Sequence, residues 1–410
     1  MQTHLADFIK NTAQGREADA ILRTCVHCGF CLATCPTYQL LGDELDSPRG
    51  RIYLVKQMLK GEPVSKKTQL HLDRCLTCRA CETTCPSGVQ YGRLIDIGRG
   101  IAEQMVPRHP LQVMQRMALR MLLPNPAVFG FLLKLGQFVR PALPAALKKV
   151  IPARQPQNAW PPARHARTML VLDGCVQPAL APNINAAAAR VLDRMNISLL
   201  RAEKAGCCGA LSFHLNAQYE GLNAMRRNID AWLPYLEQGV ETIVMTASGC
   251  GVTVKEYGHL LRHDPVYADK AARVSAASKD LSEVLLAEQE KLISLLSTKK
   301  RQPLKPKLAF HSPCSLQHGQ KITGVIEAIL TMAGFELTSV PEAHLCCGSA
   351  GTYSILQKDL SQQLLNNKVE ALESGAPNLI ASANIGCIMH LQGGAHVRVQ
   401  HWVEVLEQQL

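Results

Sequence analysis

Cysteine is the residue type whose number and spacing in this chain point most directly to chemistry. The chain has 410 residues, 16 of them cysteine, and eight of these form two copies of the pattern C-x2-C-x2-C-x3-C-P. The copies comprise Cys25, Cys28, Cys31 and Cys35, and Cys75, Cys78, Cys81 and Cys85. Thiolates are soft ligands, and bacterial ferredoxins use this spacing to hold [4Fe–4S] clusters. We therefore predict two [4Fe–4S] clusters here.

The fourth cysteine of each run is expected to bind the cluster of the other run, as in two-cluster ferredoxins. One cluster is thereby assigned to Cys25, Cys28, Cys31 and Cys85, and the other to Cys75, Cys78, Cys81 and Cys35. Zinc and disulfides are the alternatives, but a zinc ribbon needs only two C-x2-C pairs. The crossed assignment links the two runs, so loss of one cluster should destabilise both.

The other eight cysteines form a second repeat of a different kind. In each copy one cysteine precedes a Cys-Cys-Gly triplet by 32 positions, and a later cysteine follows a glycine. The copies comprise Cys175, Cys207, Cys208 and Cys250, and Cys314, Cys346, Cys347 and Cys387. Equal intervals indicate two copies of one fold. Four interpretations stay open for each copy: a further iron–sulfur centre, a structural site without metal, a zinc site, or a reversible disulfide.

The elements that must position these cysteines differ between the two regions. Residues 51–60 are apolar at helical spacing, so we expect a mainly α-helical ferredoxin domain with helix joining its two cysteine runs. Further along, short apolar runs end at cysteines at 169–175, 242–250, 307–314 and 378–387, with helical stretches such as 186–195 and 360–372 between them. This alternation predicts parallel α/β units with their sites at the carboxyl ends of strands. The predicted class is therefore a helical domain followed by two repeated α/β units.

The predicted domains are a dicluster domain over residues 1–103, a basic connector over 104–166, and two repeats over 167–300 and 301–410. Between Gln104 and Leu172 there are ten basic residues and no acidic one, against a net charge of +11 for the whole chain. The basic residues are Arg108, Arg116, Arg120, Lys134, Arg140, Lys148, Lys149, Arg154, Arg164 and Arg167. The basic charge is thus concentrated in the connector.

The connector contains an amphipathic segment followed by an apolar one at 127–139. Its apolar residues recur at helical spacing, opposite Gln112, Arg116 and Arg120: they are Leu111, Met114, Ala118, Met121 and Leu122. Such a helix can rest at a membrane surface with its cations near anionic lipid. The alternative is that it packs on the protein's own core or on a partner subunit. Nucleic acid is not expected as a partner, because no nucleic-acid-binding motif accompanies the charge.

Composition and the N-terminus indicate the compartment. With 47% hydrophobic and 19% charged residues the chain is an ordinary globular protein, which excludes collagen-like and disordered classes. The N-terminus has no apolar core of secretory length, so many cysteines point to metal or redox chemistry rather than disulfides. The most apolar uncharged run, 121–133, is shorter than the ~20 residues of a membrane span. We expect a cytoplasmic protein, peripheral on the inner face of the cytoplasmic membrane.

The spacing C-x31-C-C-G followed by a distant cysteine resembles the cysteine-rich CCG domain of heterodisulfide reductases and of membrane-linked flavin dehydrogenases. A dicluster ferredoxin joined to two CCG repeats resembles the iron–sulfur subunits of glycolate oxidase and of anaerobic glycerol-3-phosphate dehydrogenase. The stretches CVHCGFCLATCPTY, DSPRGRIYL and CLTCRACETTCPSGVQYGRL are most similar to the glycolate oxidase family. The resemblance covers essentially the whole chain.

The resemblance implies an electron-transfer subunit of a flavin-dependent 2-hydroxy-acid dehydrogenase that converts glycolate to glyoxylate. Ferredoxin clusters pass single electrons, whereas oxidation of a hydroxy acid needs a two-electron acceptor such as a flavin. The chain has no G-x-G-x-x-G fingerprint and no P-loop, so we expect FAD in a partner subunit and no substrate-oxidising site here. Electrons would continue to a membrane quinone or another acceptor. The alternatives are a glycerol-3-phosphate dehydrogenase subunit, a thiol–disulfide reductase like heterodisulfide reductase, and a nucleic-acid enzyme with structural clusters.

The repeats depart from the CCG family at one position. The family motif ends in C-x-x-C, but here its last cysteine is replaced by Thr253 in the first repeat and His390 in the second. The loss counts against a five-cysteine cluster and a disulfide-reducing site, and His390 is a candidate substitute for the thiolate. Three other histidines, His311, His318 and His344, lie near the second set of cysteines in the sequence and are expected to be structural.

Overall fold

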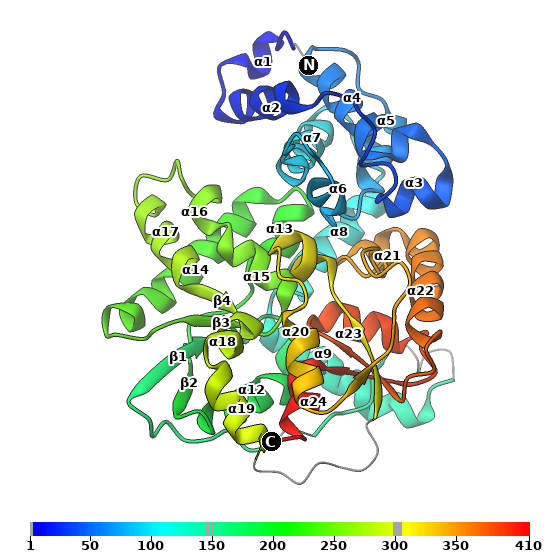
Figure 1. Cartoon of the computed structure of the whole chain (residues 1–410). Helices are drawn as coiled ribbons and strands as arrows, with labels where there is room; N and C mark the ends of the chain where they lie inside the picture. The colour runs from blue at the N-terminus through cyan, green and yellow to red at the C-terminus, as the bar shows by residue number, and fades with distance from the viewer. Residues whose placement is uncertain (1–2, 145–147, 149–150, 157, 298–305) are drawn as a thin grey trace.

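The computed structural model describes residues 3–144, 148, 151–156, 158–297 and 306–410. The predicted boundary between residues 300 and 301, and Lys149 of the connector, lie outside the described residues. The N-terminal helices lie over one end of a body built from two sheets (Figure 1).

The N-terminal region is helical and has no strand within residues 3–105. Its elements are α1 (Asp7–Lys10), α2 (Ala13–Thr24), α3 (Pro36–Leu41), the 3₁₀ turn η1 (Glu44–Asp46), α4 (Pro48–Leu59), α5 (Lys66–Asp73), α6 (Ala80–Thr83) and α7 (Tyr91–Met105). Helix α4 begins where the Ser47 side chain accepts a hydrogen bond from the Gly50 amide. It buries Ile52 and Val55 in a core shared with α7, so the predicted helical link between the cysteine runs is confirmed.

Each repeat forms a sheet of four parallel strands with the same strand order. The first sheet has the order β2-β1-β3-β4, and the second has the order β6-β5-β7-β8. The strands are β1 (Arg167–Val171), β2 (Ile197–Arg201), β3 (Ile243–Met245) and β4 (Ser278–Asp280), then β5 (Lys307–His311), β6 (Glu336–Leu337), β7 (Leu379–Ser382) and β8 (Arg398–His401). The runs predicted to end at cysteines form the two central strands of each sheet, so the α/β prediction is confirmed.

Helices cover the sheets and join the repeats into one body. In the first repeat they are α11 (Gln177–Leu180), α12 (Asn183–Asp193), α13 (Ala210–His214), α14 (Gln218–Glu237), α15 (Ser248–Lys255), α16 (Tyr257–Leu260), α17 (Ala268–Ala277), α18 (Leu281–Ala287) and α19 (Gln289–Ser297). In the second they are the π turn η3 (Ser315–Gly319), α20 (Val325–Met332), α21 (Tyr353–Leu356), α22 (Lys358–Glu373), α23 (Ile385–Gln392) and α24 (Trp402–Glu407). One apolar core spans both repeats, with Ile197 from one sheet, Ile380 from the other and Trp402 from α24.

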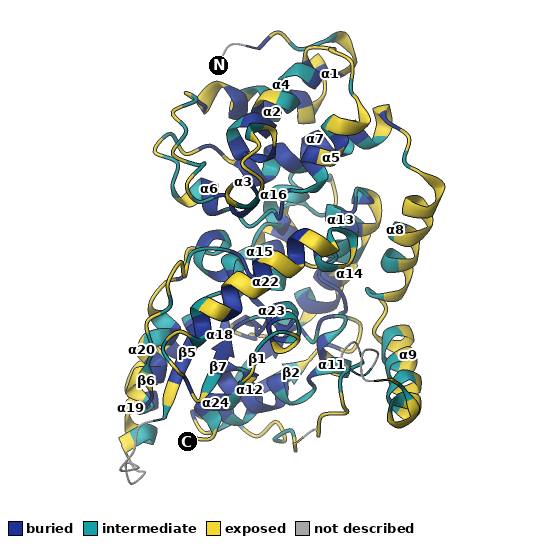
Figure 2. Cartoon of the chain, turned by 90° about the vertical axis from the view of Figure 1, so that its right-hand side faces the viewer, coloured by how far each residue is buried: buried dark blue, intermediate teal, exposed yellow. Residues whose placement is uncertain are grey.

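The connector forms two helices on one side of the molecule, α8 (Pro110–Leu122) and α9 (Pro126–Val139), followed by the turn η2 (Arg140–Ala142) (Figure 2). Neither helix has a buried residue. The predicted apolar stripe of α8 faces outward, with Leu111, Met114 and Met121 each 63% exposed. Packing of this stripe on the protein's own core, one of the alternatives above, is therefore wrong.

The same two helices decide whether the chain could enter a bilayer. Among the described helices, none is by itself long and apolar enough to cross a membrane. Taken together, α8 and the segment from Pro126 to Ala142 have the length and apolar composition of a membrane span, but the pair is bent by 101° at the break between them.

Candidate iron–sulfur centres

The first hollow gathers cysteines from both N-terminal runs. It has an empty volume of about 430 Å³, part of it open to solvent, and its cysteines are Cys25, Cys28, Cys31, Cys81 and Cys85. Cys25 ends α2, and the loop after it turns through positive φ at His27 and Gly29. Burial raises the pKa of Cys31 to about 11. The presence of Cys85 beside three cysteines of the first run supports the crossed assignment, which stays a prediction.

A second hollow of about 300 Å³ lies beside the first and is lined by Cys35, Cys75, Cys78 and Cys81. The Cys75 sulfur accepts hydrogen bonds from the Thr77 amide at 3.4 Å and from the Tyr91 hydroxyl at 3.6 Å. Burial raises the pKa of Cys78 and of Cys81 well above the usual thiol value. Because metal ligation requires thiolates, binding of a cluster here would release these protons. The soft donor set and the two adjacent hollows fit two iron–sulfur clusters.

A buried ionic network holds the two cysteine runs in place, and no spacing in the sequence predicted it. Asp46 and Arg51 are 0% and 1% exposed, and the carboxylate lies 3.2 Å from the guanidinium. Arg51 also donates to the His71 carbonyl and the Thr37 hydroxyl, and Asp46 pairs with Arg74 at 2.8 Å. These contacts join the chain after Cys35 to the chain before Cys75. Asp46 and Arg51 both lie in the stretch DSPRGRIYL. The resemblance of this stretch to a known family was the one indication in the sequence that these residues matter.

In the first repeat the four cysteines lie together at the ends of the central strands. Hydrogen-bonding contacts link Cys175 to Cys207, Cys207 to Cys208, and Cys208 to Cys250. The contacts from Cys175 and Cys208 lower the pKa of Cys207 well below the usual thiol value. Gly209 turns the chain after the cysteine pair with φ +91°, and a Cβ there would lie 2.6 Å from the Gly221 carbonyl oxygen. The sequence spacing thus produces one compact group of thiols.

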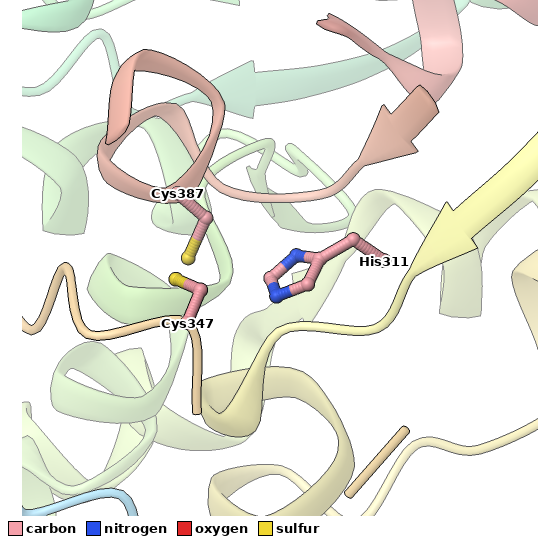
Figure 3. A group of neighbouring side chains, drawn as sticks. All are labelled: His311, Cys347 and Cys387. Atoms are coloured by element: carbon pink, nitrogen blue, oxygen red, sulfur yellow. The ribbon is translucent and has the colours of Figure 1, made fainter. Parts of the chain in front are cut away.

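The second repeat assembles its four cysteines in the same way. The Cys314 and Cys346 sulfurs lie 3.8 Å apart, and further contacts link Cys346 to Cys347 and Cys347 to Cys387. His311, at the end of β5, joins this group (Figure 3). Its ligand atom and the sulfurs of Cys347 and Cys387 all lie within 4.8 Å of one another. Burial lowers the pKa of His311 to about 3, so its imidazole is neutral at pH 7.

The other candidate residues of the sequence are hydrogen-bonded to groups other than the thiols, and His390 also contacts the Cys347 backbone. His390 Nε2 is 3.2 Å from the Ser361 hydroxyl, and the Thr253 hydroxyl donates to the Gly249 carbonyl. His318 bonds with Thr83 of the ferredoxin region and with the His344 carbonyl, as expected of a structural histidine. The expectation that His311 is only structural does not account for its place among the sulfurs.

The ferredoxin region contacts the two repeats differently. Against the second repeat, Leu76 packs in an apolar cluster with Cys346 and Tyr353, and Cys78 and Cys314 line the same cluster. Against the first repeat the contact is polar, with ion pairs such as Arg79–Glu256 and Arg262–Glu17 around a cavity of about 940 Å³. The second hollow therefore adjoins the thiols of the second repeat through this apolar cluster.

Two family models match the chain. The 4Fe-4S dicluster domain matches residues 21–89, and the cysteine-rich domain CCG matches residues 169–255 and 308–392. The matches leave the exact domain ends predicted above untested, but they agree with a dicluster region followed by two repeats.

Curated relatives match along the whole chain. The chain is 55% identical to the glycolate oxidase iron-sulfur subunit of Escherichia coli K12, covering 100% of this chain and 99% of the relative. It is 30% identical to the probable glycolate oxidase iron-sulfur subunit of Bacillus subtilis 168, over 97% and 96% of the two chains. Lactate utilization protein A of Bacillus licheniformis is 27% identical over 57% of this chain and 95% of its own length.

Proposed function

The chain belongs to the family of glycolate oxidase iron–sulfur subunits, and we propose that it carries single electrons from the FAD of a partner subunit to a membrane quinone. In this role it is the electron-transfer subunit of a glycolate oxidase complex, and the hydroxy acid is oxidised at the partner's flavin. The observation that carries the proposal is the order of the thiol groups: a hollow with the exposed Cys28, a second hollow with the buried Cys35 and Cys75, and the cysteines of the second repeat.

Electrons enter, in this proposal, at the first hollow. Cys28 is exposed, and the same loop presents Val26 and Phe30, which are 69% and 63% exposed. Exposed apolar residues beside a redox centre suit a surface on which a partner protein docks. The second hollow suits the exit, because Cys78 shares an apolar cluster with Cys314 and Cys346 of the second repeat.

A docking variant tests the entry point. Phe30→Glu places a charge in the proposed interface, and we expect at least about a tenfold loss in affinity for the flavoprotein, as for a typical interface anchor. The measurement is anaerobic co-purification with the tagged chain, together with the rate at which glycolate reduces the clusters in stopped flow. Tyr219→Glu, at a residue 75% exposed on α14, is the control and should behave as wild type.

Two results of this experiment would contradict the proposal. If the wild-type chain brings down no flavoprotein and glycolate leaves its clusters oxidised, the proposed function fails. If Phe30→Glu keeps full affinity and full reduction rate, the entry point lies elsewhere on the chain.

The acceptor side is proposed to be the membrane surface, with α8 and α9 as the contact. The outward faces of these helices are apolar, with Phe131 at 67% and Phe138 at 83% exposure. No acidic residue lies between Gln104 and Leu172, and Lys134 is exposed on α9, so the charge of this segment complements anionic lipid. The basic residues of α8 are turned inward, where Arg116 and Arg120 pair with Asp73 and Glu220. The face left to the membrane is therefore almost entirely apolar.

Vesicle binding tests this contact. The chain should sediment with vesicles of phosphatidylglycerol and phosphatidylcholine, and Phe131→Asp/Phe138→Asp should reduce the bound fraction at least about tenfold, because buried side-chain carbon contributes about 0.8 kcal/mol per CH₂. Ile293→Asp, at a residue 49% exposed on α19, is the control for adding a charge at an apolar surface position. Equal vesicle binding by both variants, or loss of the flavoprotein instead of the vesicles, would overturn the assignment.

A further inference from the structure

We propose that the metal centre of the second repeat is held by a histidine as well as by cysteines, with His311 Nε2 as a ligand of an iron–sulfur centre. The first repeat, by contrast, offers only sulfur ligands in the corresponding place. The inference goes beyond electron transfer between the ferredoxin clusters and does not depend on the identity of the substrate.

The surroundings of His311 are those of a metal ligand. The side chain is buried at 3% exposure, and its Nδ1 lies 2.9 Å from the hydroxyl of Ser382, which is itself 0% exposed. A ligating histidine is usually oriented in this way, by a hydrogen bond from the ring nitrogen that does not bind metal. The imidazole ring of His311 faces the sulfurs of Cys347 and Cys387 (Figure 3). The imidazole and two of the four thiols therefore converge on one point.

The first repeat shows what the same fold has at this place when no histidine is present. His311 stands three residues before Cys314, and Leu172 stands three residues before Cys175. Ser382 pairs with His311 across β5 and β7 and stands five residues before Cys387. Met245 stands five residues before Cys250, and the Val171–Val244 pair of β1 and β3 puts it opposite Leu172.

Leu172 and Met245 are both buried, at 4% and 1% exposure, in an apolar core. This position of the sheet can therefore be filled by two apolar side chains without loss of the fold. Burying an imidazole and a hydroxyl there instead requires that each be hydrogen-bonded or ligated, since a buried polar group without a partner destabilises the fold. Ser382 accounts for the Nδ1 nitrogen of His311, which leaves Nε2 as the nitrogen that would bind the metal centre.

His390, which occupies the position of the missing fifth cysteine, is the competing ligand. Its Nε2 lies 3.2 Å from the Ser361 hydroxyl. It does not belong to the group of mutually close ligand atoms found in the described part of the chain, whereas His311 does. We therefore assign the nitrogen ligand to His311 at the end of β5, before Cys314, and not to His390 on α23, which carries Cys387.

Ligation by His311 would change the electron affinity of the centre. Imidazole is a neutral ligand where thiolate carries a negative charge, and replacing thiolate by histidine raises the reduction potential of an iron–sulfur centre. Each electron that leaves a cluster in the second hollow would reduce the centre of the second repeat by one electron and leave that cluster oxidised by one electron. The packing of Cys78 against Cys314 and Cys346 places donor and acceptor side by side.

Nitrogen spectroscopy on the full chain tests the proposal. Chain isolated without air should hold clearly more than the about eight irons of two [4Fe–4S] clusters. Its reduced spectrum should contain an imidazole-nitrogen coupling in pulsed electron paramagnetic resonance, replaced by the ¹⁵N pattern after labelling with ¹⁵N-histidine. His311→Leu/Ser382→Met installs the apolar pair of the first repeat, so folding should be preserved while the coupling disappears. His390→Gln is the matched control and should retain the coupling.

Three outcomes would overturn the inference: a coupling that persists in His311→Leu/Ser382→Met, a coupling that disappears in His390→Gln, or an iron content of about eight in the wild type. Zinc in the second repeat would give the third outcome. Reduction of the two ferredoxin clusters by glycolate is measured on the same samples in the presence of the flavoprotein partner. Failure of the proposed function is thereby distinguished from failure of the histidine ligand.

Discussion

Cys28→Ser and Cys85→Ser should remove the same cluster, although the two cysteines are 57 positions apart in different runs. The reason is that both line the first hollow, where Cys85 joins Cys25, Cys28 and Cys31. Cys78→Ser and Cys35→Ser should remove the other cluster, because these two line the second hollow. Each variant should lose about four irons at least, and glycolate-driven electron transfer should fall below about one per cent of wild type.

The measurement is iron and sulfide per chain together with the spectrum of the cluster that remains. Crossed ligation predicts two pairs of matching spectra, Cys28 with Cys85 and Cys78 with Cys35. Uncrossed ligation predicts the pairs Cys28 with Cys35 and Cys78 with Cys85, and would contradict the assignment. Thr83→Ala, at the end of α6 between Cys81 and Cys85, removes a hydrogen bond to His318 and should keep the full iron content.

Local sequence patterns predicted the helical first domain and the central strands of both sheets. Of the eight strands in the described part of the chain, four were predicted, because β1, β3, β5 and β7 are apolar runs that end shortly before a cysteine. Two of the outer strands have no such signal: β6 is only Glu336–Leu337, and β4, Ser278–Asp280, contains no apolar residue. They form because each pairs with a central strand, and such pairing is a property of the assembled sheet.

The candidate sites were predictable to the extent that ligands recur at fixed spacing. All 16 cysteines fall into groups that the spacing anticipated. A single histidine has no spacing of its own, so His311 could be found only from the register that pairs it with Ser382 and from the Leu172–Met245 pair of the other repeat. The outward face of α8 was undecided for a similar reason, since an amphipathic stripe does not say what covers it.

Asp46 has the second large predicted effect, on stability. Asp46→Ala should lower the free energy of unfolding of the ferredoxin region by about 3–5 kcal/mol, because removal of one member of a buried ion pair leaves the other charge uncompensated. That charge is on Arg51, which is 1% exposed and anchored to the His71 carbonyl at 2.7 Å. Surface pairs contribute only about 0–1 kcal/mol, so Asp7→Ala, at an exposed pair with Lys10, is the control.

The reason the effect should reach the clusters is the position of Asp46 between the two cysteine runs. Its backbone carbonyl accepts from the Thr37 hydroxyl, which itself lies 3.3 Å from the Cys35 sulfur, and its carboxylate holds Arg74, the residue before Cys75. Thr37 contacts Cys35 and Arg74 precedes Cys75, and both cysteines line the second hollow. The cluster in the second hollow should therefore be lost first on denaturation. The measurement is cluster absorbance and helix content against urea concentration without air. A free energy of unfolding within about 1 kcal/mol of wild type, or simultaneous release of both clusters, would show that the network does not hold the second hollow.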